Sequence, residues 1–391
     1  MIKRISFSVV IILVACLIIS CGGNKKKETS EETTDTLKSV NKIEIQTNKK
    51  YTDIAKFVSG MPVDEKSELY ELSQTASFKT YVSSSDSSWA RFEKKRLAKM
   101  RTWAGEEISD LNKDLKTLFY PFSGPDFVHA YTLFPKATTY IMFGLEPVGN
   151  IPDFNKIPKE KLGDFFSALN YSIEDALSLS FFKTIDMSKE LNSELISGAL
   201  PVILLFVART GHEIVDIKPI DLDKNGKIKV IDSFLNLKSE ASYNKGAEIT
   251  FIQTGDSIIR KIIYFSANVA DGGLKLNLNC ENYFKNMEEN VVTMVKSATY
   301  LMHKGHFSII RNTVLSKSKS ILQDDSGIAY KFFDSAKWNI QLYGEYKGPI
   351  ALFANHFETD LQQAYAKLNI KPVSFQYGYG SHSVVLVARK K

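Results

Sequence analysis

The chain has 391 residues, a length that suits one large globular domain or two modest ones. Hydrophobic residues make up 44% of it and charged residues 24%, which is ample material for a packed core. The formal net charge of +6 is too mild to indicate a nucleic-acid partner, which requires a concentrated basic stripe.

The first twenty residues have the pattern of an export signal. Lys3 and Arg4 form a positively charged start, and an uninterrupted apolar run follows from Val9 to Ile19. A membrane-spanning helix needs roughly 20 apolar residues, so this run is too short to span and fits the hydrophobic region of a signal peptide. Removal of residues 1–20 takes away these two charges and lowers the net charge from +6 to +4.

The signal ends in Ile18-Ile19-Ser20-Cys21, which resembles the lipobox of bacterial lipoproteins. The resemblance implies that Cys21 receives a diacylglycerol on its thiol, becomes the N-terminus after cleavage and is acylated on its new amine. Several acyl chains matter because one chain alone binds a membrane only marginally. Gly22 stands where an acidic residue would favour the inner membrane, so the resemblance implies an outer-membrane location in the cell envelope. A plain secretory signal with an incidental cysteine is the alternative.

Residues 22–50 contain no aromatic residue and little else that folding would bury. We therefore expect residues 21–50, which begin with the lipidated cysteine, to form a disordered tether. The body then spans residues 51–391, as a single unit or as lobes 51–210 and 211–391. Cys280 is the one cysteine of the body, so no intramolecular disulfide forms there and its stability depends on burial alone.

Helices are predicted at the start of the body. The spacing of Ile54, Phe57 and Val58 predicts a helix from Tyr51. A second helix is predicted from Ser88 as N-cap, with an apolar face and a basic face. The basic face consists of Arg91, Lys94, Lys95, Arg96, Lys99 and Arg101. Such a face is usually a solvated helix surface, and contact with anionic lipid is the alternative.

Strands and helices then alternate along the chain. Strands are predicted at 118–122, 138–145, 212–222, 228–234, 248–253, 258–265, 373–377 and 384–388. Further helices are predicted at 127–134, over most of 159–208, at 281–302 and at 357–368. No repeat and no long linker divides the body, so the sequence predicts an α/β or α+β fold with mixed sheet flanked by helices.

The clearest candidate site is the turn at residues 123–126, between a predicted strand and a predicted helix. Open α/β sheets bind ligands at such glycine turns, beside a helix N-terminus. An acidic residue that closes the next strand often holds a ribose hydroxyl, and Glu146 has this position. His129 would project from the first helical turn toward the same place. The candidate ligand-binding residues are therefore Ser123, Gly124, Asp126, His129 and Glu146.

This arrangement resembles the opening of Rossmann-like methyltransferases, and the predicted last strand pair resembles their terminal hairpin. The resemblance implies a degenerate Rossmann-like core. The turn departs from the family pattern because it has one glycine, and because Pro125 lacks the backbone N–H that a ligand would use. An extracytoplasmic location also argues against a nucleotide cosubstrate. The alternative is a plain turn in which Asp126 caps its helix.

A calcium loop is suggested by Asp221, Asp223, Asn225 and Asp232, whose spacing matches part of an EF-hand. Strands flank this segment, however, and Asn225-Gly226 is a strong signal for a hairpin turn. We therefore predict a hairpin without calcium.

Two other residue pairs are weaker candidate sites. His303 and His306 are close enough in sequence to share a metal, with carboxylates from Asp324 and Asp325, but Gly305 indicates a helix end. Ser381 and His382 pair a nucleophile with a base, but neighbours on a strand point to opposite faces. The sequence therefore predicts no metal and no cofactor.

Two classes of function remain. The first is a lipid-anchored extracytoplasmic lipoprotein whose body binds a small molecule or a protein partner. The second is an envelope enzyme, either a hydrolase or a degenerate Rossmann-like transferase. The enzyme requires Asp126, His129, Glu146 and Asp324 to line one cleft, whereas scattered surface positions favour binding or a structural role.

Overall fold

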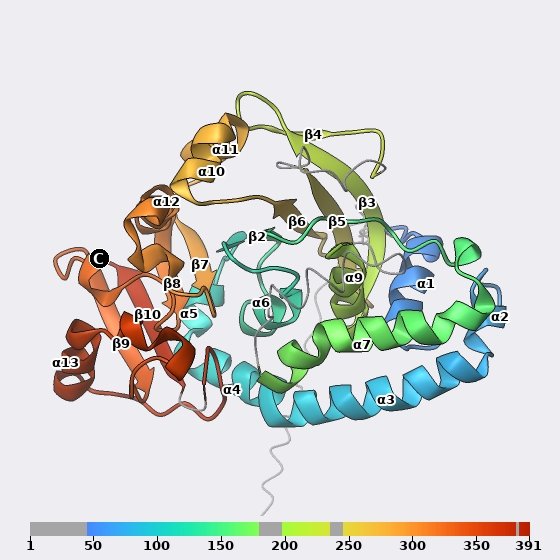
Figure 1. Ribbon diagram of the computed structural model, residues 1–391, viewed down its shortest axis with the longest axis horizontal. Helices are drawn as coiled ribbons and strands as arrows, with labels where there is room; N and C mark the ends of the chain where they lie inside the picture. Colours follow the sequence, from blue (N-terminus) through green and yellow to red (C-terminus); the bar gives the residue numbers. More distant parts are fainter. Residues whose placement is uncertain (1–44, 180–197, 235–244, 381–382) are drawn as a thin grey trace, which may run out of the picture. The chain divides into compact units, whose positions relative to one another are not determined.

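The computed structural model describes residues 45–179, 198–234, 245–380 and 383–391 (Figure 1). The signal segment, most of the predicted tether and the Ser381-His382 pair lie outside the described residues. The described residues form one compact unit. Its first helix, α1 (Lys49–Val58), starts two residues before the predicted body, with Asn48 as its N-cap. No helix of the described part is long and apolar enough to cross a membrane.

A single ten-stranded sheet organises this unit, in the order β4-β3-β5-β6-β2-β1-β7-β8-β10-β9. The strands are β1 (Thr117–Tyr120), β2 (Thr139–Gly144), β3 (His212–Leu222), β4 (Ile228–Val230), β5 (Gly246–Gln253), β6 (Arg260–Ser266), β7 (Val291–Val295), β8 (Ser318–Gln323), β9 (Trp338–Gly344) and β10 (Val384–Lys390). Strands from both halves of the chain share the sheet. The predicted α/β class with a mixed sheet is therefore confirmed.

The five central strands β6, β2, β1, β7 and β8 run parallel to one another. Numbered in chain order they stand as 3-2-1-4-5, which is the order of a doubly wound sheet. Antiparallel strands extend the sheet beyond β6 and beyond β8. The direction of winding reverses between β1 and β7, and sheets of this kind bind ligands outside the carboxyl ends of the strands at that reversal.

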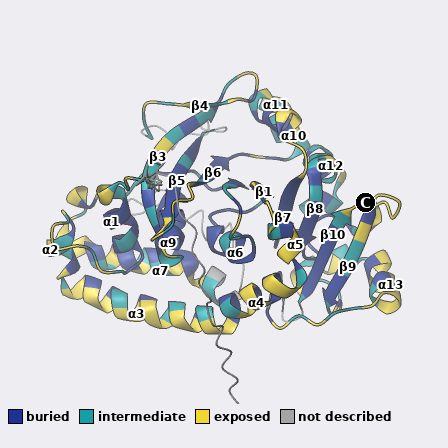
Figure 2. Cartoon of the chain, turned by 180° about the vertical axis from the view of Figure 1, so that it is seen from behind, coloured by how far each residue is buried: buried dark blue, intermediate teal, exposed yellow. Residues whose placement is uncertain are grey.

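Helices cover both faces of the sheet, as Figures 1 and 2 show. One face packs against α1, α3 (Ala76–Phe92), α4 (Ala98–Glu107), α6 (Phe127–Leu133), α7 (Leu162–Leu179) and α9 (Leu200–Arg209). The other packs against α10 (Asp271–Leu276), α11 (Leu278–Asn286), α12 (Ser308–Lys317) and α13 (Thr359–Lys367). Successive strand residues alternate between the two cores, because Leu118 and Tyr120 enter the first and Phe119 the second.

Short elements complete the body. Two further helices are α2 (Tyr70–Ser73) and α5 (Ser109–Asn112). The 3₁₀ turns are Phe154–Lys156, Lys159–Lys161, Leu301–His303, Gly305–Phe307, Tyr330–Phe332 and Ala351–His356. Helix α9 is apolar and buried from Leu200 to Ala208, and it ends in Arg209.

The predicted helix start at Ser88 is wrong. Helix α3 begins at Ala76, with Thr75 as N-cap, and continues through the π turn η1 (Glu93–Leu97) into α4. The serine-rich first half looks like a loop because serine competes for backbone hydrogen bonds. Tertiary packing decides otherwise: Phe78 stacks on a ring of α1 with centroids 4.5 Å apart, and Tyr81 stacks on a ring of α7 at 4.4 Å.

The predicted helix at 281–302 is also wrong. Helix α11 ends at Asn286, Asn290 adopts a left-handed turn conformation, and β7 follows in the centre of the sheet. The run from Val291 to Val295 is mostly β-branched, which favours a strand. The last strand pair differs too. Strand β10 pairs with β8 and β9 rather than with residues 373–377, which belong to none of the described strands.

The Asn225-Gly226 turn joins β3 and β4 in an antiparallel hairpin, as predicted. The carboxylate of Asp223 accepts the backbone N–H groups of Asn225 and Lys227, both at 2.8 Å. Both bonds lower the pKa of Asp223, and the bond from Lys227 contributes most.

Because the carboxylate of Asp223 already serves its own turn, we expect no calcium site here. Calcium at about 5 mM, above the dissociation constants of extracellular calcium modules, should leave the melting temperature of the protein unchanged. Asp223→Ala should lower the melting temperature equally with and without calcium. A rise with calcium that Asp223→Ala abolishes would make the loop a calcium site.

Candidate functional site

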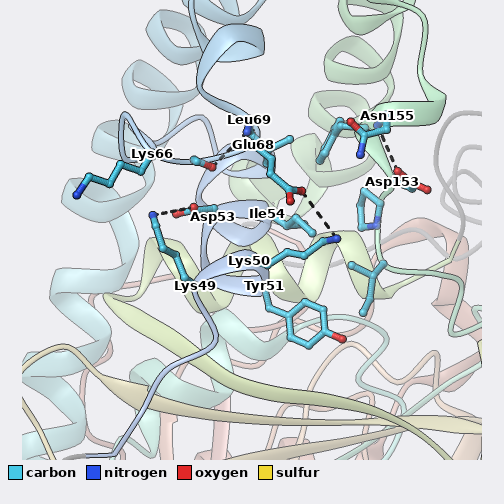
Figure 3. A pocket seen from close by; sticks show the side chains of 14 residues that line it. Lys49, Lys50, Tyr51, Asp53, Ile54, Lys66, Glu68, Leu69, Asp153 and Asn155 are labelled. Carbon is cyan, nitrogen blue, oxygen red and sulfur yellow. Dashed lines mark hydrogen bonds and ion pairs between the residues drawn. The ribbon is translucent and has the colours of Figure 1, made fainter.

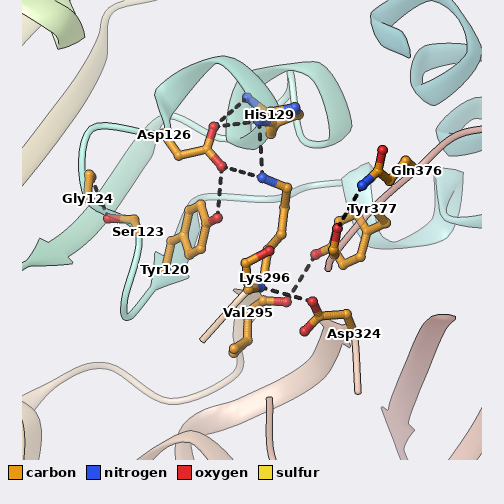
Figure 4. A network of polar contacts seen from close by, with 12 residues as sticks. Tyr120, Ser123, Gly124, Asp126, His129, Val295, Lys296, Asp324, Gln376 and Tyr377 are labelled. Atoms are coloured by element: carbon orange, nitrogen blue, oxygen red, sulfur yellow. Dashed lines mark hydrogen bonds and ion pairs between the residues drawn. The ribbon is translucent and has the colours of Figure 1, made fainter. Parts of the chain in front are cut away.

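A buried network of charged and polar side chains lies where the sheet reverses its winding (Figure 4). Asp126 caps α6 on the loop after β1, and Lys296 directly follows β7. The ammonium of Lys296 lies 2.9 Å from Asp126 Oδ2, which also accepts a bond of 3.0 Å from the hydroxyl of Tyr120. His129 Nδ1 lies 2.6 Å from Asp126 Oδ1. Each of these four residues is at most 3% exposed.

Burial and pairing act in opposite directions on these groups. Burial alone would raise the pKa of Asp126, but the neighbouring His129 and Lys296 outweigh it and lower that pKa below its ordinary value. Burial lowers the pKa of Lys296 and, against the pull of Asp126, lowers the pKa of His129 to about 4. His129 is therefore neutral at neutral pH, and Asp126 and Lys296 form a buried ion pair.

The imidazole of His129 has one bonded edge and one free edge. Its Nδ1 bonds to Asp126, so the geometry assigns the proton to Nδ1. Its Nε2 is buried and has no hydrogen-bond partner among the described residues. A carboxylate that holds a histidine in this tautomer is the orienting half of an acid–base arrangement.

Two backbone N–H groups of the predicted turn at residues 123–126 are hydrogen-bonded to the neighbouring strand β2. The N–H groups of Ser123 and Gly124 both donate to the carbonyl of Phe143, at 2.7 and 3.3 Å. Gly124 has φ +50°, and a Cβ there would lie 3.3 Å from Glu146 Oε2. The structure thus brings Gly124 and Glu146 together, as the sequence predicts, but both strand-end carboxylates, Asp126 and Glu146, are buried. The backbone N–H groups of the turn itself, those of Ser123, Gly124 and Asp126, are already used and do not offer a phosphate a free donor.

The loops after β7 and β8 close on each other in the same way. Asp324 accepts the N–H of Ser297 at 3.0 Å and the hydroxyl of Ser326 at 2.6 Å. Gly378 lies so close to this carboxylate that no side chain fits there. Burial, with Asp325 adding to it, raises the pKa of Asp324 to about 7. Asp324 is buried, as are Asp126, His129 and Glu146. These four residues therefore neither line an open cleft nor lie scattered on the surface.

Backbone strain accompanies this closure. Ser297, Thr299 and Tyr300 follow β7 with φ between 51° and 55°, and Phe122 follows β1 with φ 61°. Such left-handed conformations are uncommon for residues other than glycine, and they persist only where surrounding contacts impose them. Here the loop-to-loop hydrogen bonds impose them.

The cavity next to this network is bounded by α3, η1, α7 and α9 and has a volume of about 670 Å³. We call it the helical cavity. One of its lining residues contacts the network, and a second acts on it electrostatically. The Phe92 ring meets the His129 ring edge to face, with centroids 5.6 Å apart. The Arg96 guanidinium acts electrostatically on both Asp126 and Lys296. The network therefore forms the wall behind this cavity.

A second cavity, of about 490 Å³, lies at the N-terminus of α1 (Figure 3). Lys49 lies 3.1 Å from Asp53 there, and Lys50 lies 3.8 Å from Glu68. Both lysines are exposed, so these pairs are screened by water and contribute little. A solvated groove of this kind selects weakly among ligands.

A third cavity, of about 350 Å³, lies beside Glu358 and His303. Burial raises the pKa of Glu358 to about 8 and lowers that of His303 to about 4, and the two side chains approach to 3.7 Å. His303 and His306 lie on successive 3₁₀ turns rather than on one helix. Among the described residues no three His, Cys, Asp or Glu side chains are placed to hold a metal ion.

Three members of the site, Tyr120, Lys296 and Arg96, are not among the predicted site residues. The sequence does not single out Lys296, because it falls inside the wrongly predicted helix at 281–302. A signal existed, since Lys296 follows a β-branched run just as Glu146 comes after β2. Arg96 was assigned to the solvated basic face, yet only 8% of it is exposed. Its spacing carried a signal, because Phe92, Arg96 and Met100 stand four residues apart and share one helix face.

No protein-family model, no curated protein and no solved structure matches this chain.

The buried pair generates a stability prediction. Lys296→Met should lower the free energy of unfolding by about 3–5 kcal/mol, because it leaves the Asp126 carboxylate buried without its counter-charge. The double variant Asp126→Asn/Lys296→Met removes both charges and should lose less than Lys296→Met alone. Urea denaturation followed by circular dichroism measures these differences.

The matched control is Lys285→Met, which removes a lysine whose ammonium lies 2.7 Å from Glu281 on the protein surface. It should cost at most about 1 kcal/mol. Additive losses in the double variant, or a loss from Lys296→Met no larger than that of the control, would show that the pair is not the buried interaction described here.

Proposed function

We propose that this protein is a lipid-anchored lipoprotein of the bacterial cell envelope whose α/β body binds a ligand in the helical cavity. One observation supports the proposed binding site: the described loops at the point where the sheet reverses its winding leave no open crevice there. Two N–H groups of the turn at residues 123–126 bond to β2, Asp126 of that turn pairs with Lys296, and the loops after β7 and β8 bond to each other. The open space lies instead beside them, behind Phe92 and Arg96.

The anchor rests on the N-terminal pattern. A charged start, an apolar run too short to span a bilayer and Ile18-Ile19-Ser20-Cys21 agree with a lipoprotein signal. Acyl chains on Cys21 would hold the protein in the outer membrane, and Gly22 supports that location over the inner membrane. The residues between Cys21 and α1 would then link the lipid to the folded unit.

A hydrolase of the envelope is the second candidate, and one observation favours it. Asp126 orients His129 so that Nε2 is the free nitrogen, as a general base requires. Binding is preferred because the histidine is fully buried and the adjoining Lys296 completes an ion pair. A transferase with a nucleotide cosubstrate is not favoured, because the glycine turn offers no free donor to a phosphate.

The anchor is tested by Cys21→Ser. This variant should lose incorporation of an alkyne-labelled fatty acid and should leave the membrane fraction or accumulate as uncleaved precursor. Cys16→Ser is the matched control, because Cys16 lies inside the apolar run and should be dispensable. Wild-type labelling and fractionation of Cys21→Ser would overturn the lipoprotein assignment.

A further inference from the structure

We propose that the ligand of the helical cavity is an amphiphilic anion: an apolar chain or ring that carries a phosphate, sulfate or carboxylate group. This inference rests on the proposed function in placing the ligand in that cavity, and it adds the ligand's chemical class. Three properties of the cavity carry it: the charge of its walls, the apolar surface between them and its size.

Basic residues dominate the charge of the cavity. Its lining includes Arg91, Lys95, Arg96 and Arg209, against Glu174 as the one acidic residue among the described lining residues. Arg91 and Lys95 are exposed and form no ion pair within the described part of the chain. A concave surface with an excess of one charge attracts ligands of the opposite sign, and its low-dielectric walls strengthen the attraction. The cavity therefore selects an anion.

Arg209 is held in a fixed position in the wall. Its guanidinium donates to the carbonyl of Ser59 at 2.8 Å, to the hydroxyl of Ser85 at 2.8 Å and to Asp86 at 2.6 Å. Its side chain is 9% exposed, whereas Asp86 is 56% exposed. The positive group is thus positioned inside while its partner stays in water. A preorganised cation of this kind loses little entropy when an anion approaches.

Apolar side chains separate the basic groups. They are Trp89, Phe92, Ile173, Leu177 and Leu205, with the ring of Tyr171 beside them. The Arg209 guanidinium lies 5.8 Å from the Trp89 ring centroid, and the Arg96 guanidinium lies 5.8 Å from that of Phe92. Each of these two guanidinium groups therefore lies beside an aromatic ring of the wall. A purely ionic ligand would leave the aromatic surface wet, whereas an amphiphile covers both.

The volume of about 670 Å³ fits this class. Ligand cavities commonly measure about 300–1,000 Å³, which admits a head group with a short chain or ring system but no polymer. Outside the cavity, Lys94 and Lys99 extend the basic face of the same helix into solvent. The ligand chemistry therefore has two sources, a lipid in a bilayer or a free amphiphile, and the test has to separate them.

The test uses the chain from residue 22 onward, which is the mature protein without its acyl groups. Dodecyl phosphate, dodecyl maltoside and dodecyltrimethylammonium are titrated below their micelle concentrations, with tryptophan fluorescence as the readout. Trp89 lies in the cavity, so the signal should vanish in Trp89→Phe while calorimetry still detects binding. Dodecyl phosphate should bind most tightly, and the cationic amphiphile should not bind.

Charge variants locate the anion. Arg91→Gln/Lys95→Gln removes two lining charges and should weaken dodecyl phosphate binding about tenfold. Lys94→Gln/Lys99→Gln removes two charges from the same helix outside the lining and should change the dissociation constant less than about twofold. Equal effects of the two double variants would overturn the assignment of the head group to this cavity.

The remaining outcomes separate the inference from the proposed function. Tighter binding of the maltoside or the cation, with the Trp89 signal retained, would overturn the anionic class and leave the cavity as the binding site. If none of the three amphiphiles binds, both the anionic ligand class and the binding function are overturned. The lipid anchor is then still tested separately by Cys21→Ser. Sedimentation with phosphatidylglycerol vesicles but not phosphatidylcholine vesicles identifies a bilayer source, whereas binding of the free amphiphile alone identifies a soluble one.

Discussion

The ion pair between Asp126 and Lys296 is the constraint on which the rest of the site depends. It joins the loop after β1 to the loop after β7 across the point where the sheet reverses its winding. Two charges buried this deeply are tolerable only when they pair and when their remaining bonding groups are satisfied. Tyr120 and His129 meet that requirement by bonding to the same carboxylate. The pair thus ties together two loops that an open crevice would hold apart.

This constraint explains why the cavity lies beside the reversal and not at it. With Asp126, Lys296 and Asp324 fixed in the interior, the turn after β1 bonds to β2 and the loop after β7 bonds to Asp324. The strained conformations after β7 follow from that closure. On the side of the neighbouring helices, the Phe92 ring packs on His129 and Arg96 acts electrostatically on Asp126. The helical cavity, lined by α3, η1, α7 and α9, includes these two side chains in its wall.

Local patterns predicted the parts of the fold that depend on local physics. The alternation of His212–Leu222 predicted β3 with its observed bounds, and the capping residue Asp126 predicted the start of α6. β7 was missed because periodicity alone does not separate a short buried strand from a buried helix. The five predicted site residues gather at one edge of the sheet. Lys296 meets Asp126 across 170 residues of sequence, and no local pattern states that contact.

The continuous helical segment of α3, η1 and α4 makes the cavity wall rigid. This helical rod is fixed at its start by the stacked rings of Phe78 and Tyr81. Near its end the hydroxyl of Tyr343 donates to Glu107 at 2.9 Å, and Arg389 donates to the carbonyl of the same residue at 2.9 Å. The rod is therefore clamped to α1 and α7 at one end and to the strands β9 and β10 at the other. Because this wall is held at both ends, it is preorganised. Binding of a ligand therefore costs little free energy for rearranging the wall.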